Sequence, residues 1–180
     1  VVNHAHLGAT LEAALGQGAA WGVQLHYSPE TTALETAGGI ARALPLLDEV
    51  FWVLAADVFT PGFEFSQAAV KRFASSGMLA HLWLVPNPTH NPRGDFGLEP
   101  DPAHADGPAL ALNLDSADPR PRYTYSTIGL YRAALFAPPW CDIPAGNPHG
   151  VKAALAPLLR ALPSPGAADD SVMRPGSRLT

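Results

Sequence analysis

The distribution of proline constrains how this chain can fold more than any other feature. Of its 19 prolines, only Pro29, Pro45 and Pro61 precede residue 86, and the other 16 occur from that residue onwards. Proline removes a backbone hydrogen-bond donor and interrupts helices and central strands. We therefore expect regular helices and strands in the first half, and long loops between fewer elements in the second.

Apolar residues in the first half alternate between helical and extended patterns. Helical spacing predicts helices over residues 7–16, 40–47 and 66–76, and short apolar or alternating runs predict strands over 22–27, 51–56 and 78–85. The run over 51–56 (FWVLAA) is almost wholly apolar, as in a strand buried on both faces. This alternation predicts an α/β fold with a mostly parallel sheet and helices on both sides.

The second half carries fewer recognisable elements. We expect strands over residues 95–98, 109–114 and 122–131, and a helix over 151–162 that Pro157 would kink. The chain from residue 163 is rich in Pro, Gly and Ser, which is typical of a loose tail. We therefore predict one domain over residues 1–162 and a tail over 163–180.

Charge and composition exclude several classes of partner. The net charge is −5 and only two lysines occur, so the basic surface that nucleic acid requires is missing. No run approaches the roughly 20 apolar residues of a membrane-spanning helix. A single cysteine, Cys141, suits a reducing cytoplasm. The chain opens Val1-Val2-Asn3, which resembles the end of a strand that began upstream, so we expect an N-terminal truncation.

Asp57 is the most informative carboxylate. It follows the apolar run 51–56, at the carboxyl end of a predicted buried strand, where open α/β sheets bind ligands. Mg²⁺ takes few protein carboxylates and completes its shell with water and phosphate oxygens, so one aspartate at this place could hold it. The alternative is an N-cap or turn aspartate ahead of Pro61 and Gly62, and spacing alone does not separate the two.

A glycine pair marks a second candidate segment, residues 34–40 (LETAGGI). Gly38 and Gly39 stand where a loop enters a predicted helix, and free backbone N–H groups there would suit an anion or the polar edge of a base. Glu30, earlier in the same loop, could accept hydrogen bonds from a nucleobase. Glycines are common at such junctions, and an exposed loop glutamate is the ordinary interpretation of Glu30.

The third candidate segment is residues 87–96 (NPTHNPRGDF). Gly94 permits close approach of a ligand, Asp95 could bind sugar hydroxyls, and Arg93 could bind a phosphate. A polar turn leading into the next strand is the alternative. The histidines add no metal motif: His4 and His6 have no carboxylate or cysteine close in sequence, and His81 lies within an apolar strand as a core or face histidine.

Taken in order, five segments resemble those of bacterial sugar-1-phosphate nucleotidyltransferases. The resemblance is strongest to the N-acetylmuramate α-1-phosphate uridylyltransferases and the mannose-1-phosphate guanylyltransferase-like proteins. It covers about residues 1–160, and the matching segments are 1–8, 27–40, 53–65, 87–96 and 123–132. It implies a Rossmann-like α/β sandwich with a mixed sheet. It also implies a cytoplasmic enzyme of nucleotide-sugar biosynthesis and peptidoglycan recycling, whose partners are a nucleoside triphosphate and a sugar 1-phosphate.

The resemblance also assigns roles to particular residues. Asp57 corresponds to the catalytic aspartate that holds Mg²⁺. The nucleotide-binding positions correspond to Glu30, Ala37, Gly38 and Gly39, and the substrate-binding positions to Ala55, Gly94 and Asp95. The implied reaction is attack of the sugar phosphate on the α-phosphorus of UTP or GTP, which needs positioning and charge neutralisation more than proton transfer.

Three departures from the family pattern affect this assignment. The family's glycine-rich loop with an arginine would lie upstream of Val1. Ala55 stands where the family has an asparagine that hydrogen-bonds substrate. The family's closing metal aspartate has no clear counterpart, since Asp169 and Asp170 precede a poorly matching run. We expect the 180-residue chain alone to have little activity. Two alternatives stay open: a catalytically inactive nucleotide-sugar-binding or regulatory relative, and a non-functional fragment.

Overall fold

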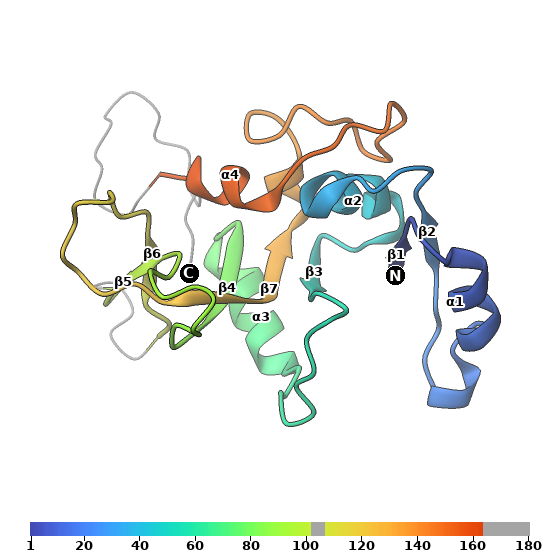
Figure 1. Ribbon diagram of the computed structural model, residues 1–180, viewed down its shortest axis with the longest axis horizontal. Helices are drawn as coiled ribbons and strands as arrows, with labels where there is room; N and C mark the ends of the chain where they lie inside the picture. The colour runs from blue at the N-terminus through green and yellow to red at the C-terminus, as the bar shows by residue number, and fades with distance from the viewer. Residues whose placement is uncertain (102–106, 164–180) are drawn as a thin grey trace. The chain divides into compact units, whose positions relative to one another are not determined.

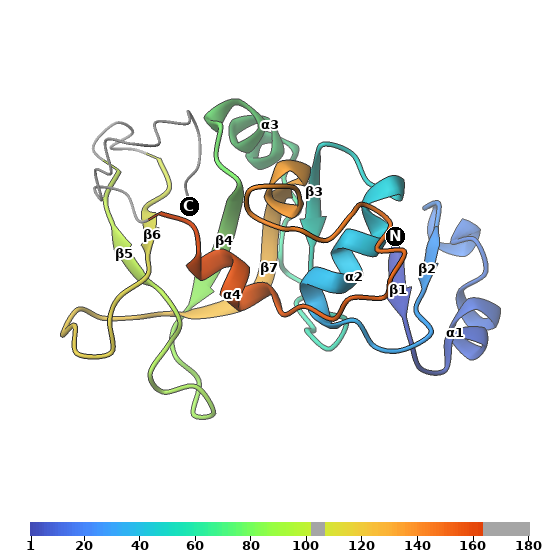
Figure 2. The same ribbon diagram turned by 90° about the horizontal axis from the view of Figure 1, so that it is seen from above.

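A computed structural model describes residues 1–101 and 107–163 of the chain (Figures 1 and 2). The chain divides into two compact units. The first comprises Val1–Glu49 and Ala133–Leu158, and the second comprises Val50–Arg132 and the chain from Leu159. The predicted tail over 163–180 lies almost wholly outside the described residues.

The first unit is built around a short parallel strand pair and a buried helix. Val2 pairs with Tyr27 and His4 pairs with Pro29 in the parallel register. Its elements, in chain order, are β1 (Val2–His4), α1 (Gly8–Leu15), η1 (Ala19–Trp21), β2 (Tyr27–Pro29), α2 (Glu35–Ala43), η2 (Leu44–Leu46) and η3 (Ala133–Phe136). Helix α2 buries the face that carries Ile40 and Ala41, and it packs against η3.

The second unit contains a three-stranded sheet, a helix and a two-stranded ribbon. Figure 2 shows β7 between β4 and β3, and the strand pairing gives the same order. The elements are β3 (Val50–Val53), α3 (Gln67–Ser76), β4 (Ala80–Val85), β5 (Gly97–Glu99), β6 (Leu110–Leu112) and β7 (Thr124–Arg132), while α4 (Leu155–Arg160) crosses the boundary between the units. The core of this unit consists of Phe73, Met78, Leu110 and Leu130.

Helix α3 forms where the sequence predicts it, because both of its ends are encoded locally. The Ser66 side chain accepts a hydrogen bond from the Ala69 N–H at 3.4 Å, which caps the first turn. Gly77 ends the helix at φ 71°, a left-handed conformation that glycine adopts without strain. Phe73 then projects from α3 into the core beneath β7.

The α/β class is confirmed, but the prediction of a mostly parallel sheet is wrong for the described pairings. Only β1 and β2 pair in parallel, whereas β3–β7, β4–β7 and β5–β6 are antiparallel. Strands β3 and β4, joined through α3, do run in the same direction. Strand β7 returns after a long loop and inserts between them, so each pairs with an antiparallel neighbour.

Two predicted elements also have different boundaries. The strand expected over 22–27 is instead a turn region, because Val23 N–H and Leu25 N–H donate to the carbonyls of Gly18 and Gln17, and the strand starts only at Tyr27. The helix expected over 151–162 is reduced to Leu155–Arg160. Pro157 thus lies in the first turn, where its missing N–H costs no intrahelical hydrogen bond. Across the described ranges, every helix is too short or too polar to cross a bilayer.

Candidate functional site

Asn3 links the predicted nucleotide-binding residues of the first unit. From the middle of β1, its Nδ2 group donates to the Gly39 carbonyl at 2.8 Å and to Glu30 Oε1 at 3.2 Å. The other carboxylate oxygen of Glu30 accepts from the Leu34 N–H at 2.9 Å. A Cβ atom at Gly39 would lie 2.8 Å from Glu30 Oε1, so glycine is what lets the helix approach this carboxylate. Glu30 and Gly39 are therefore brought together, as the sequence predicts.

The glycine pair lies inside helix α2, and its backbone donors are already used. The N–H groups of Ala37 and Gly38 both donate to the Ala153 carbonyl, at 2.9 and 3.1 Å. The Ala153 N–H donates back to the Leu34 carbonyl. The expectation of free N–H groups at Ala37 and Gly38 is therefore wrong, because a segment more than 100 residues later occupies them. Contact of Ala37, Gly38 and Gly39 with a nucleotide stays a prediction that cannot rest on those two donors.

Asn147 fixes the segment that makes this contact. It is fully buried, and its side chain donates to the carbonyls of Gly38 (3.1 Å) and Val151 (2.8 Å) while accepting from the Val151 N–H (2.8 Å). A Cβ atom at Gly38 would lie 2.5 Å from the Val151 carbonyl oxygen. The helix and the segment after Asn147 are thus packed backbone to backbone.

In the second unit, Asp57 lies four residues beyond the end of β3. The Val58 N–H donates to the Ala55 carbonyl at 3.4 Å, which closes a turn with Asp57 inside it. The Asp57 side chain is exposed, and within the described part of the chain it makes no hydrogen bond or ion pair. The N-cap alternative is wrong, since Ser66 caps the following helix. Asp57 is a turn aspartate whose carboxylate is available to a ligand.

Aromatic packing anchors the loop that presents Asp57. Trp52 on β3 contacts the rings of Phe63 and Phe65, with centroids 5.9 and 5.1 Å apart, and Trp83 on β4 at 4.9 Å. Phe63 also contacts Phe65 and Trp83. We call Trp52, Phe63, Phe65 and Trp83 the aromatic cluster. The cluster holds the part of the loop that follows Asp57 against the sheet. Packing therefore anchors the loop that carries Asp57.

Asp95 is engaged within its own unit. Its carboxylate accepts from the Tyr125 N–H at 2.8 Å and from Asn91 Nδ2 at 3.2 Å. Gly94 has φ 64°, and a Cβ atom there would lie 2.7 Å from Asn87 Oδ1 and 2.8 Å from the Arg122 backbone. The segment 87–96 is therefore pinned to the start of β7. Contact of Gly94 and Asp95 with a sugar stays a prediction.

The side chain of Tyr125, whose N–H binds Asp95, makes a hydrogen bond of its own. Its hydroxyl lies 2.7 Å from that of Tyr131, which is fully buried. Burial raises the pKa of Tyr125 to about 12 and the pKa of Tyr131 well above its usual value. Both rings stay neutral at ordinary pH, and the hydrogen bond between the two hydroxyls joins two residues of β7.

The predicted phosphate-binding arginine is uncommitted, and no ready-made metal cluster accompanies it in the described residues. Arg93 is exposed, and the described ranges offer it no hydrogen-bond partner or carboxylate. Within residues 1–101 and 107–163, no three His, Cys, Asp or Glu side chains are grouped so as to hold a metal ion by themselves. A Mg²⁺ ion at Asp57 would have to take most of its ligands from water and phosphate.

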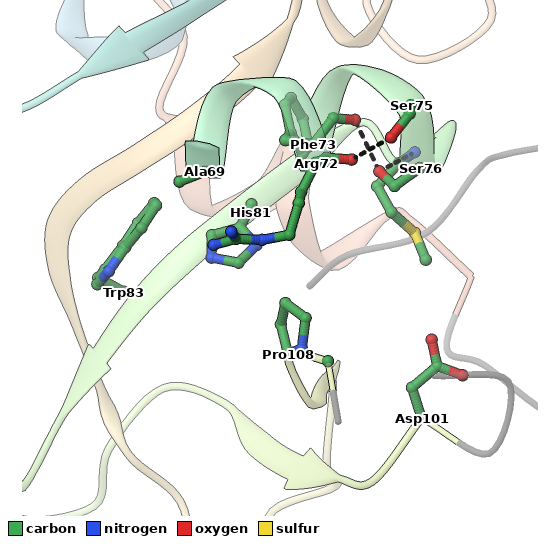
Figure 3. A pocket seen from close by; sticks show the side chains of 11 residues that line it. Ala69, Arg72, Phe73, Ser75, Ser76, His81, Trp83, Asp101 and Pro108 are labelled. Carbon is green, nitrogen blue, oxygen red and sulfur yellow. Dashed lines mark hydrogen bonds between the residues drawn. The ribbon is translucent and has the colours of Figure 1, made fainter. Parts of the chain in front are cut away.

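A pocket of about 260 Å³ lies between α3, β4 and the segment before β6, and none of the predicted site residues lines it (Figure 3). Its lining includes the apolar side chains of Phe73, Met78, Trp83 and Pro108, and the Arg72 side chain extends toward His81 (Figure 3). Burial, reinforced by the charge of Arg72, lowers the pKa of His81 to about 4. His81 is therefore a neutral, largely buried histidine facing α3.

The asparagines that organise both regions are not among the residues predicted from the sequence. Asn3 is predicted only as part of a strand end, and Asn87 and Asn91 lie in a segment whose predicted ligands are Arg93, Gly94 and Asp95. Their positions in matching segments were the available signal. No sequence signal marks Asn147, because its role depends on contacts with a helix more than 100 residues away in the chain.

Comparison with known proteins agrees with the resemblance. No protein-family model matches the chain. The chain is 42% identical over 167 residues to the N-acetylmuramate alpha-1-phosphate uridylyltransferase of Neisseria meningitidis serogroup B (strain ATCC BAA-335 / MC58). That match covers 89% of this chain and 63% of the relative, so the chain spans less than two thirds of the relative's length.

A solved structure supports the fold. The crystal structure of a protein from Bacillus anthracis, described as a glucose-1-phosphate thymidylyltransferase in complex with a sucrose, superposes with a TM-score of 0.52. The superposition covers 72% of this chain and 50% of that one, at 17% sequence identity. At that identity the likeness shows a shared fold and nothing more.

Proposed function

Since the chain is a homologue of the sugar-1-phosphate nucleotidyltransferases, we propose that the protein containing it joins a nucleoside monophosphate to a sugar 1-phosphate. The observation that carries the proposal is the 42% identity to the uridylyltransferase over 89% of the chain. The matched length includes the residues around Glu30, Asp57 and Asp95. This similarity also favours UTP over GTP as the donor and N-acetylmuramate 1-phosphate as the acceptor.

The proposed reaction is a displacement at phosphorus. A phosphate oxygen of the sugar 1-phosphate attacks the α-phosphorus of UTP and forms the new P–O bond. The bond from that phosphorus to the bridging oxygen of the β-phosphate breaks, and pyrophosphate leaves with the electron pair. Two anions must meet, so the protein's contribution is positioning and charge neutralisation.

Asp57 is the residue proposed to hold Mg²⁺. Its carboxylate is exposed, free of hydrogen bonds within the described residues and presented by an anchored turn, which fits a cation that needs one or two protein oxygens. When bound, Mg²⁺ would neutralise phosphate oxygens of both reactants. Arg93, which is exposed and directly precedes Gly94, is the candidate for contact with a phosphate.

Glu30 is proposed to recognise the base. Asn3 and the Leu34 N–H each hold one of its carboxylate oxygens, which fixes the carboxylate plane and leaves further lone pairs to accept from a base N–H. Gly39 permits close approach at this point. Ala37 and Gly38 would contact the base only through van der Waals packing, because their N–H groups already donate to the Ala153 carbonyl.

The sugar side is proposed to involve Gly94 and Asp95. Asp95 has one internal hydrogen bond on each carboxylate oxygen, so each retains a lone pair for a sugar hydroxyl. Ala55 would supply only its backbone and methyl group there. The absence of an amide at this place is the observation that favours a second candidate function, a relative that binds nucleotide sugars without turnover.

The test is a substrate panel on the protein that contains this chain. UTP, GTP, CTP and dTTP are each combined with N-acetylmuramate 1-phosphate, glucose 1-phosphate or mannose 1-phosphate, and pyrophosphate release is measured with Mg²⁺. We expect release with UTP and N-acetylmuramate 1-phosphate. Binding of UDP-sugar by calorimetry without any pyrophosphate release would instead establish the non-catalytic function. Release by the isolated 180-residue chain would overturn the expectation that it is inactive alone.

The Asp57 assignment has a matched control in the same loop. Asp57→Asn should lower turnover at least ~100-fold, on the order of the loss of one transition-state charge contact, and leave the melting temperature within a degree or two because the side chain has no internal partner. Glu64→Gln removes an equally exposed charge seven residues later and should leave turnover unchanged. Equal activity in the two variants would remove Asp57 from the mechanism.

A further inference from the structure

Thr127 has a backbone conformation that its side chain disfavours. Its φ is +68°, in the left-handed region. Four non-glycine residues of the described chain have positive φ, and Thr127 alone among them is β-branched. Branching at Cβ makes this conformation especially unfavourable, so such a residue persists only where its surroundings impose it.

The surroundings are a bulge in the central strand of the sheet. Leu82 of β4 pairs with Gly129 and Leu84 pairs with Tyr125, so one β4 residue faces three residues of β7, 126–128. On the other edge, pairing with β3 stops at Val53 and Gly129. The bulge therefore begins where the pairing of β7 with β3 ends.

This position adjoins the residues of the proposed sugar side. Val53 and Gly129 are the last pair between β3 and β7; Ala55 follows Val53 by two residues, and Thr127 precedes Gly129 by two. On the β7 side, the Tyr125 N–H, two residues before Thr127, donates to the Asp95 carboxylate at 2.8 Å. Thr127 thus lies on the stretch of β7 between Gly129, the last residue paired with β3, and Tyr125, which binds Asp95.

The Thr127 hydroxyl is unsatisfied. Its Oγ1 atom is buried, and no residue in 1–101 or 107–163 forms a hydrogen bond with it. Its neighbour differs, because Ser126 Oγ accepts from the Ile128 N–H at 3.3 Å. A buried hydroxyl without a partner destabilises a protein, and here that cost adds to the strained backbone. Valine at this position would remove the cost of the buried hydroxyl and keep the shape of the side chain.

We propose that Thr127 is a sugar-contacting residue whose hydroxyl binds a hydroxyl or acyl oxygen of the sugar 1-phosphate. This inference rests on the proposed function. The Thr127 residue keeps part of its surface exposed, and rotation about χ1 would break no hydrogen bond of its hydroxyl. A hydroxyl both donates and accepts, so it suits a neutral oxygen substituent of the sugar and contributes to the choice of sugar.

The test compares Thr127→Val with Thr127→Ser. In the valine variant, the melting temperature of the ligand-free protein should stay the same or rise. Its KM for N-acetylmuramate 1-phosphate should rise about fivefold, which corresponds to about 1 kcal/mol, one neutral hydrogen bond. Its KM for UTP and its kcat should stay near the wild-type values. The serine variant keeps the hydroxyl and should keep the wild-type KM.

The possible outcomes separate this inference from the proposed function. If the wild type releases pyrophosphate and Thr127→Val has an unchanged KM for the sugar phosphate, Thr127 is a strained structural residue and the inference is wrong. If the wild type shows no turnover, calorimetric titration with N-acetylmuramate 1-phosphate replaces KM. Equal affinity of wild type and valine variant, or no binding by the wild type, overturns the inference.

Discussion

The two regions that carry the predicted site are held by different interactions. Around Glu30 and Gly39, polar groups are locked to one another by Asn3, and the helix backbone is bonded to Ala153. Around Asp57, the carboxylate has no internal partner in the described residues. The loop is held by rings of the aromatic cluster and not through Asp57 itself. We infer that the first region is built for fixed recognition, whereas the second presents a carboxylate to a partner from outside the chain.

The same substitution in both regions gives the largest expected contrast. Gly38→Ala would place a Cβ atom 2.5 Å from the Val151 carbonyl oxygen, and a buried backbone contact of this kind cannot yield easily. We expect a loss of about 3 kcal/mol in the free energy of unfolding, at the upper end for overpacking. Urea denaturation measures it.

Gly62→Ala, in the Asp57 loop, is the matched control. A Cβ atom there would meet nothing within 4 Å, and its φ is not positive. We expect a neutral or slightly stabilising change, up to about 0.5 kcal/mol, because alanine restricts the unfolded chain. Similar losses at both glycines would mean that the two regions are equally close-packed, and the comparison would fail.

A second pair tests whether aromatic packing fixes the Asp57 loop. Phe63 contacts three rings of the aromatic cluster, whereas Phe59 in the same loop is 89% exposed. Phe63→Ala should cost about 2 kcal/mol of folding stability, since the ring is only partly buried, and should lower turnover by loosening Asp57. Thermal unfolding and the pyrophosphate assay measure both effects.

Phe59→Ala serves as the control for this pair. Removing an exposed ring should change the free energy of unfolding by less than about 0.5 kcal/mol. If Phe63→Ala lowers stability but leaves turnover intact, the loop does not need its aromatic anchor to present Asp57.

The smallest effect is a dependence of stability on pH in the second region. His81, whose ring centroid lies 4.4 Å from that of Trp83, has its pKa lowered by burial from the usual 6.5 to about 4. Between these values the unfolded chain binds a proton that the folded chain does not, so stability falls as pH drops from 6.5 to 4. We expect His81 to account for about 1–2 kcal/mol of this loss, allowing for its residual exposure.

Comparison with a variant isolates that contribution. Urea denaturation of the wild type and of His81→Asn between pH 7 and pH 4 should give curves that converge as the pH falls, because only the wild type loses the His81 contribution. The substitution His90→Asn removes an exposed loop histidine and controls for the loss of a histidine elsewhere. Parallel curves for wild type and His81→Asn would show that the pKa of His81 is the same in the folded and unfolded chains.

Local sequence determined the elements whose signals are local. Helix α3 follows from an apolar period of 3.6 residues, a serine cap and a terminal glycine, all within 12 residues. The order of five family-like segments indicated the similarity to the uridylyltransferase, and the position of Asp57 after an apolar strand indicated a candidate ligand for a cation. Each of these depends on residues close together in the chain.

The tertiary structure decided which strands pair and which polar groups form hydrogen bonds with one another. No local pattern indicates that β7 inserts between β3 and β4, that Ala153 occupies the donors of Ala37 and Gly38, or that Tyr125 binds Asp95. Backbone donors and acceptors are chemically the same at nearly every residue, so which ones meet is set by the packing of distant segments. The sequence therefore determined which groups were present, and only the fold decided which of them stayed free to bind a ligand.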